Sequence, residues 1–195
     1  MLRAFQRRAE SQRKAGELYG AIVTQARRPE FYADLGVPDT PNGRYEMVVL
    51  HLVLVLERLK DGDAGEFARD VVEAFVADMD DSLRELGTGD LAVPRKVRRA
   101  AAGLYERLEG YRAGLREDGQ KGLQAALVRH GLYAGAESPG CASLAAYVRR
   151  AAEMLARQDA GQVTAAKPTF PLMPGPEGGP RRVPQTRTAV TRTRT

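Results

Sequence analysis

The sequence contains few of the residues from which most catalytic and metal sites are built. Its 195 residues include no tryptophan, two histidines and one cysteine, Cys141. A single cysteine excludes an intramolecular disulfide, and two histidines are too few for most metal sites or catalytic triads. The sequence has no P-loop, dinucleotide-binding, zinc-protease or C-x-x-C motif. We therefore expect a protein that is not an enzyme, with no catalytic residue, cofactor or metal.

Long apolar runs are also missing. The longest, residues 47–56, is interrupted by His51 and is about half the ~20 residues that a membrane span needs. The N-terminus has no apolar segment of the secretory type. We expect a protein that does not cross a membrane.

Positive charge is concentrated at the two ends of the chain. The net charge is +5 overall, but residues 1–14 and 159–195 each carry +4, which leaves −3 for residues 15–158. Basic ends favour contact with phosphate-rich surfaces such as ribosomal RNA or anionic lipid headgroups. Solvated termini that aid solubility are the competing explanation.

Apolar residues recur at helical spacing along most of the chain, which predicts an all-α fold of about six helices. One stripe has strict i+4 spacing, and Asp63 and Glu66 form a capping box before it. The stripe consists of Phe67, Val71, Phe75, Met79 and Leu83. Residues 30–43 contain two glycines and two prolines and are expected to form a loop.

Residues 45–60 are apolar on every side. The valines in this segment also favour a buried strand. We predict a helix, because the segment is long for a strand and no partner strand is evident. A helix that is apolar all round has to be surrounded by other helices or by a ligand.

The sequence changes character at Asp159. Six of the eleven prolines lie in residues 168–184, and threonine and arginine alternate after them. Such a segment buries too little surface to offset its ordering entropy. We therefore predict one compact helical domain, residues 1–158, and a disordered basic tail, residues 159–195.

Three features have both a chemical and a structural interpretation. Cys141 is either a buried small residue or a lone nucleophile. His51 is a satisfied core histidine, a histidine that lines a groove, or a ligand of a metal or haem. Asp78, Asp80 and Asp81 either bind a divalent cation or form a solvated helix face. The structural interpretation is the commoner one in each case.

Two blocks of sequence resemble the ubiquinol–cytochrome c chaperone family. The first runs from Phe31-Tyr32 through residues 36–40 and 43–46 to Leu50-His51 and Arg58-Leu59. The second comprises residues 78–80, 83–87 and 89–90, followed by the basic residues 96–99. The resemblance covers roughly residues 15–155 and excludes the tail.

The resemblance implies a helical, non-catalytic chaperone that binds newly made cytochrome b during assembly of the bc1 complex. Mitochondrial relatives pair with a small helper protein and work near the ribosomal exit tunnel, so these are implied partners. The resemblance also implies a cytoplasmic protein with peripheral contact at the inner membrane, on the matrix side if the source is eukaryotic. We expect no DNA partner, and the composition suggests a bacterial member. The residues that we expect to bind a partner are Asp39, Thr40, Arg44, His51, Asp80, Leu83, Arg84, Glu85, Gly87, Gly89 and Asp90.

An alternative function follows from the charge distribution alone. A ribosome- or RNA-associated module would use the basic ends for salt-dependent contacts with phosphate. The predicted tail offers one aromatic side chain, Phe170, for base stacking, which argues against base-specific recognition.

Overall fold

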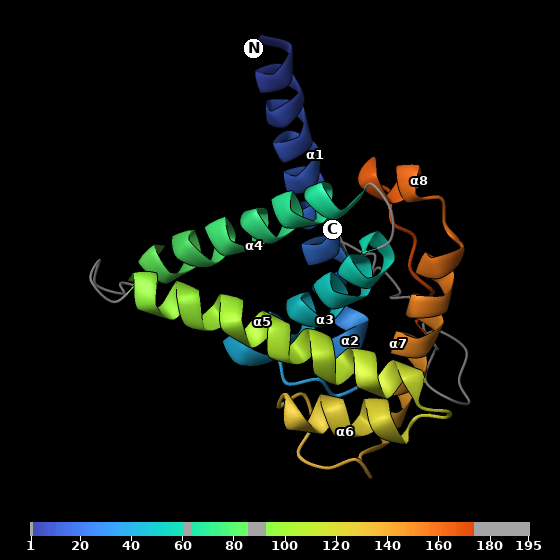
Figure 1. Ribbon diagram of the computed structural model, residues 1–195. Helices are drawn as coiled ribbons and strands as arrows, with labels where there is room; N and C mark the ends of the chain where they lie inside the picture. The colour runs from blue at the N-terminus through green and yellow to red at the C-terminus, as the bar shows by residue number, and fades with distance from the viewer. Residues whose placement is uncertain (1, 61–63, 86–92, 174–195) are drawn as a thin grey trace, which may run out of the picture.

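The computed structural model describes residues 2–60, 64–85 and 93–173. These residues form eight helices and no strand, which confirms the predicted all-α class (Figure 1). Six of the helices correspond to the six that the sequence predicted, and two helices of five residues were not predicted. The helices are α1 Leu2–Ala26, α2 Pro29–Ala33, α3 Pro41–Leu59, α4 Gly65–Glu85, α5 Val93–Arg116, α6 Lys121–Arg129, α7 Pro139–Arg157 and α8 Ala160–Thr164.

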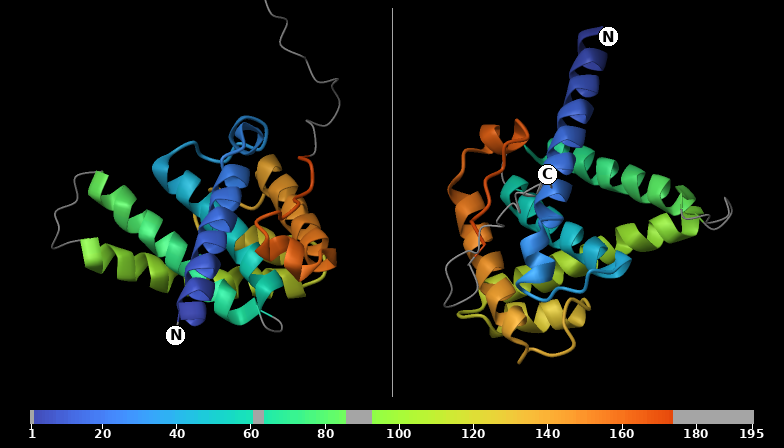
Figure 2. Two further views of the ribbon diagram at one scale, coloured as in Figure 1. Left: turned by 90° about the horizontal axis from the view of Figure 1, so that it is seen from above. Right: turned by 180° about the vertical axis from the view of Figure 1, so that it is seen from behind.

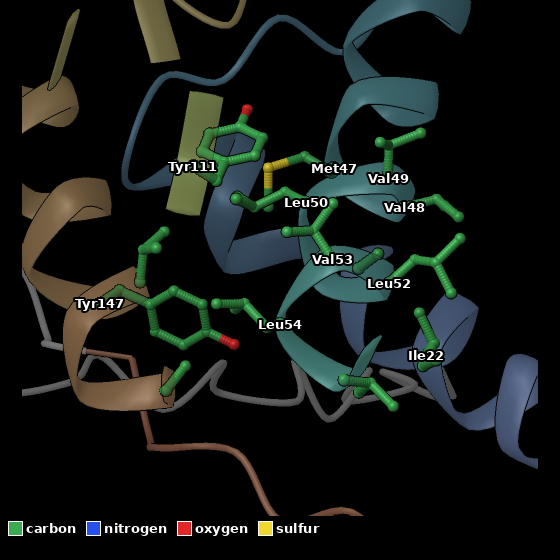
Figure 3. Close-up of a cluster of buried hydrophobic side chains, with 14 of the residues drawn as sticks. Ile22, Met47, Val48, Val49, Leu50, Leu52, Val53, Leu54, Tyr111 and Tyr147 are labelled. Carbon is green, nitrogen blue, oxygen red and sulfur yellow. The ribbon is translucent and has the colours of Figure 1, made fainter. Parts of the chain in front are cut away.

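Helix α3 is the centre of the molecule, and the alternative of a buried strand is wrong. Thr40 caps its start and Pro41 occupies its first turn, where a missing N–H costs nothing. Twelve of its 19 residues are buried. Helices α1, α5 and α7 contact it from different sides, and Ile22, Tyr111 and Tyr147 point into the same core (Figure 3).

The expected loop at residues 30–43 contains the short helix α2. Pro29 follows the end of α1, and its fixed φ suits the first position of a new helix. The new helix places the side chain of Phe31 in the core, where it is fully buried. The loop prediction was therefore wrong for residues 30–33 and for residues 41–43, which begin α3.

The expected domain boundary at residue 158 also needs correction. Asp159 caps α8 by accepting a hydrogen bond from the Gly161 amide at 2.7 Å. Val163 and Met173 are buried in the common core. Residues 159–173 thus belong to the domain, because a few apolar side chains suffice to hold a short segment on it. Residues 174–195 lie outside the described part of the chain.

Helices α4 and α5 project together from the body as a hairpin (Figures 1 and 2). Helix α4 packs on α1, where the Tyr19 hydroxyl donates a hydrogen bond to Asp78 at 2.7 Å. Of the described side chains of α4, those of Val71 and Phe75 are fully buried. The predicted capping residue Asp63 lies outside the described residues.

The first turns of α1 extend beyond the body as an arm (Figure 2). Arg3, Arg7 and Arg8 are exposed there, and the Phe5 side chain is 75% exposed. A helix without tertiary support is marginally stable in water. The arm therefore differs from the later part of α1, where Leu18 and Ile22 are fully buried.

Arg149 of α7 holds the C-terminal end of α5. Its guanidinium donates hydrogen bonds to the carbonyls of Gly114 and Leu115, both at 3.2 Å, and of Glu117 at 2.8 Å and Gly119 at 2.5 Å. Helices end with carbonyls that lack an intrahelical partner. One cation satisfies several of them here and joins α5, the following loop and α7.

No helix among the described residues has the combination of length and apolar character that crossing a membrane requires.

Candidate functional site

Asp39, Thr40 and Arg44, from the first block, build the entry to α3. The Thr40 hydroxyl accepts a hydrogen bond from the Gly43 amide at 3.1 Å, and Arg44 pairs with Asp39 at 2.6 Å. A Cβ atom on Gly43 would lie 2.0 Å from the Pro38 carbonyl oxygen, so this turn requires glycine. The Arg44 guanidinium lowers the pKa of the Asp39 carboxyl, and the Asp39 carboxylate raises the pKa of Arg44.

Asp39 and Arg44 also line an open cleft of about 580 Å³ between the end of α1, α2 and the start of α3. Arg27 and Tyr32 line the opposite part. The Tyr32 hydroxyl donates to the Ala26 carbonyl at 2.9 Å, which fixes its ring. The cleft presents arginine and tyrosine side chains around one ion pair, an arrangement that suits polar contact with a protein surface.

His51 is a satisfied core histidine. Its Nδ1–H donates to the Met47 carbonyl at 2.8 Å, since a carbonyl can only accept. Its Nε2 accepts from the Tyr147 hydroxyl at 2.9 Å, and that oxygen accepts from Gln25 at 3.0 Å. Both ring nitrogens are occupied, which leaves none for a metal or haem. Complete burial lowers the pKa of His51 to about 4.

Aromatic rings surround His51. The ring centroids of Phe31, Tyr147 and Phe170 lie 5.3, 5.7 and 5.4 Å from that of His51. Phe31 and Phe170 meet it edge to face, the arrangement that aromatic quadrupoles favour. We call these four side chains the aromatic cradle. It joins α2, α3, α7 and the segment after α8.

Glu46 forms a buried ion pair that the sequence prediction missed. Its side chain is 2% exposed, and Arg107 of α5 binds both carboxylate oxygens, with Nε–Oε2 at 2.7 Å. The guanidinium also lies over the Tyr45 ring. The pairing raises the pKa of Arg107 further. A carboxylate directly before the apolar run 47–56 of α3 was the signal for such a partner.

The second block lies on the projecting hairpin. Arg84 pairs with Asp80 at 2.7 Å, one turn apart in α4. Leu83 and Glu85 belong to the last turns of α4, and their side chains are not described. Gly87, Gly89 and Asp90 lie outside the described residues. The partner-binding role expected for residues of this block stays a prediction.

The two chemical alternatives from the sequence receive no structural support. Cys141 is fully buried in the first turn of α7, and burial raises the pKa of its thiol. A raised pKa disfavours the nucleophilic thiolate. Within the described parts of the chain, no group of three His, Cys, Asp or Glu side chains is placed to hold a metal ion.

Comparison with known proteins gives consistent results. A family described as Ubiquinol-cytochrome C chaperone matches residues 33–170. Ubiquinol-cytochrome-c reductase complex assembly factor 1 of Xenopus laevis is 27% identical over 141 residues, 71% of this chain and 70% of that protein. The crystal structure of the Cbp3 homolog from Brucella abortus superimposes with a TM-score of 0.77 and 34% identity, and covers 88% of this chain and 97% of the other.

Proposed function

Because the chain belongs to the ubiquinol–cytochrome c chaperone family, we propose that it binds newly made cytochrome b while the bc1 complex is assembled. The observation that carries this proposal is the match over residues 33–170, which covers α3, the second block and all of the first block except Phe31 and Tyr32. Binding and release of the client are its whole activity, without catalysis. The fold supports this role with a rigid core, a polar cleft and a projecting hairpin.

The proposed client-binding surface includes the cleft residues Asp39 and Arg44 and the hairpin residues Asp80 and Arg84. Each of these side chains is at least one-third exposed, so a partner can reach it. Charged side chains at the edge of an interface steer the encounter and fix orientation more than they raise affinity. Loss of these charges is therefore expected to slow binding while the fold persists.

Deletion of the gene tests the proposed function. We expect the haem b absorbance of membranes and the amount of cytochrome b to fall, and to recover with the wild-type gene. A variant with Asp39→Ala, Arg44→Ala, Asp80→Ala and Arg84→Ala is expected to restore less of both. Unchanged haem b spectra and cytochrome b levels in the deletion strain would refute the proposal.

A second candidate function is contact of the N-terminal arm with the ribosome. The exposed side chains of Arg3, Arg7 and Arg8 favour it, because phosphate contacts by arginine give salt-dependent binding. Co-sedimentation with ribosomes should fall with rising salt and in the variant Arg3→Gln, Arg7→Gln, Arg8→Gln. Transfer of this variant from the membrane to the soluble fraction would assign the arm to lipid headgroups instead. A helper protein that binds the chain should be recovered together with the wild-type chain, both from ribosomes and from membranes.

A further inference from the structure

The chain after α8 turns back and runs along α7 over the edge of α3 (Figures 1 and 2). We call residues 165–173 the strap. The Phe170 ring completes the aromatic cradle beside His51, and Met173 is 6% exposed. Between them the Leu172 side chain points outward and is 76% exposed. The strap thus buries Pro171 and Met173, packs Phe170 partly buried against the core, and leaves Thr169 and Leu172 exposed.

The side chain of Gln158 binds the strap by its backbone. Its Nε2 donates to the Thr169 carbonyl at 2.7 Å, and its Oε1 accepts from the Thr169 amide at 2.8 Å. This is the pattern by which one residue of a β-strand pairs with its neighbour. Because the Gln158 amide bonds main-chain groups alone, it can bind the backbone of a peptide of any sequence. Arg58 fixes the position of Gln158 by donating to its carbonyl at 3.1 and 2.7 Å.

The attachment of the strap is weaker than that of the helices around it. From Pro168 to Met173 the strap has no helical hydrogen bonds of its own. Gln158 and Thr169 are bonded at a surface position, where water competes for both groups. Ala166, at the junction with α8, has φ of +59°, a conformation that costs energy for a residue with a Cβ. Segments with such features are the first to open in folded proteins.

We propose that the strap occupies, in cis, a peptide-binding groove between α3 and α7, and that an extended apolar segment of the client protein takes its place. The segment would supply an aromatic side chain for the cradle and an aliphatic one three residues later. The Gln158 amide would hold its backbone. The proposal rests on the proposed function for the identity of the client, but the groove is defined by this chain's own contacts.

The chemistry of the groove fits a newly made membrane protein. Such a chain presents apolar segments whose backbone amides are not yet paired within helices. A backbone clamp with two apolar positions accepts many such segments, because main-chain bonds give affinity and alternate pockets give selectivity. The strap prevents the groove from standing open in the absence of a client, since an exposed apolar groove invites aggregation.

A labelled peptide in trans tests the groove. The probe is a fluorescent peptide with the sequence of residues 167–173, Lys-Pro-Thr-Phe-Pro-Leu-Met, and fluorescence anisotropy measures its binding to the full chain. We expect the Phe170→Ala variant to bind the peptide about tenfold more tightly than the wild type, because the competing strap is weakened. Equal affinities would overturn the proposal.

Leu172→Ala is the matched control. It shortens an apolar side chain of the same strap that points into solvent, so its affinity for the peptide should equal that of the wild type. Tighter binding by this variant would show that the peptide responds to surface apolarity alone, which also overturns the proposal. A peptide in which alanine replaces phenylalanine should not bind any variant.

Two further variants keep the test decisive if Phe170→Ala does not fold. Thr169→Pro removes the amide that Gln158 accepts from, and it should raise peptide affinity although every side chain of the cradle is retained. Gln158→Ala removes the clamp from strap and peptide alike, so peptide binding should be lost. The NMR signal of the His51 ring should shift in Thr169→Pro and return towards the wild-type position when peptide is added.

Competition by peptides from apolar segments of cytochrome b separates the groove from the proposed function. Displacement of the strap peptide supports both. Binding of the strap peptide without displacement supports the groove and counts against cytochrome b as its occupant. Failure of the strap peptide to bind any released variant overturns the groove, whatever the effect of gene deletion on the bc1 complex.

Discussion

Helices α3 and α4 have similar lengths and opposite surroundings. Twelve of the 19 residues of α3 are buried, whereas Val71 and Phe75 are the fully buried ones among the described side chains of α4. α3 is apolar all round and is enclosed by other helices. α4 projects from the body (Figure 2). It has one apolar stripe, and its other sides face solvent. The same secondary structure therefore serves a core and a projecting limb.

The contrast extends to the ion pairs of the two helices. Glu46 of α3 is 2% exposed and its partner Arg107 is 18% exposed. Asp80 and Arg84 of α4 are 35% and 49% exposed. Burial strengthens an electrostatic pair but leaves a costly charge when one partner is removed. Ion pairs near solvent contribute little to folding and stay available to a partner.

Removal of Glu46 should have the largest effect on stability. Glu46→Ala leaves the Arg107 guanidinium largely buried without its carboxylate, and we expect a loss of about 3–5 kcal/mol in the free energy of unfolding. Urea denaturation followed by circular dichroism measures it. If Glu46→Ala lost no more stability than the control variant Asp80→Ala, the Glu46–Arg107 pair would not be buried in solution.

The control for Glu46→Ala is Asp80→Ala in the hairpin, for which we expect less than about 1 kcal/mol. The double variant Glu46→Met, Arg107→Met sharpens the comparison. Since apolar side chains of similar volume can replace a buried pair without loss, it should recover most of the stability lost in Glu46→Ala.

Truncation of one apolar side chain in each helix compares their packing directly. Leu52→Ala in α3 empties space around a fully buried side chain, and we expect a loss of about 3 kcal/mol. Met79→Ala in α4 affects a partly buried side chain, and we expect about 1 kcal/mol. Thermal and urea unfolding of the two variants measure the difference. Equal losses would show that the hairpin is as closely packed as the core.

Acid should destabilise the core through His51. Its pKa is about 4 in the folded chain and about 6.5 when unfolded. The unfolded state therefore binds the extra proton first, and the contribution to stability is full above pH 6.5 and is lost as pH falls towards 4. Between pH 7.5 and 5 we expect a loss of about 2 kcal/mol through this group.

The variant His51→Gln isolates this effect from other titrating groups. It should be less stable than the wild type at pH 7.5 and should lack the part of the pH dependence that belongs to His51. Parallel stability curves for the two proteins between pH 7.5 and 5 would contradict the assigned burial of His51.

The sequence predicted the elements of this fold well because their signals are local. Apolar spacing located all six long helices, and the apolar surround of residues 45–60 placed α3 at the centre before any partner was known. The start of α3 also has a local signal, since Thr40 caps it and Pro41 occupies its first turn. His51 was correctly interpreted as a core histidine, since a single ring in an apolar helix usually finds two partners.

The sequence could not reveal contacts between distant residues. Glu46 and Arg107 are 61 positions apart, and nothing local in α5 distinguishes Arg107 from its arginine neighbours. The boundary after Gln158 was misplaced because proline content outweighed three apolar residues, Val163, Phe170 and Met173. Val163 and Met173 are buried and Phe170 is partly buried, by contacts with distant parts of the chain that exist only after folding. The family resemblance carried the predicted function, which composition alone left open.

Arg149 joins the C-terminal end of α5 to α7, and ion pairs of Arg107 and Arg112 with Glu46 and Glu57 hold α5 on α3. A helix of 24 residues is about 36 Å long, so the end of α5 that belongs to the hairpin lies far from these attachments. A tilt of about 10° about the attached end would displace the far end by about 6 Å. The attached part of α5 therefore sets the position of the hairpin.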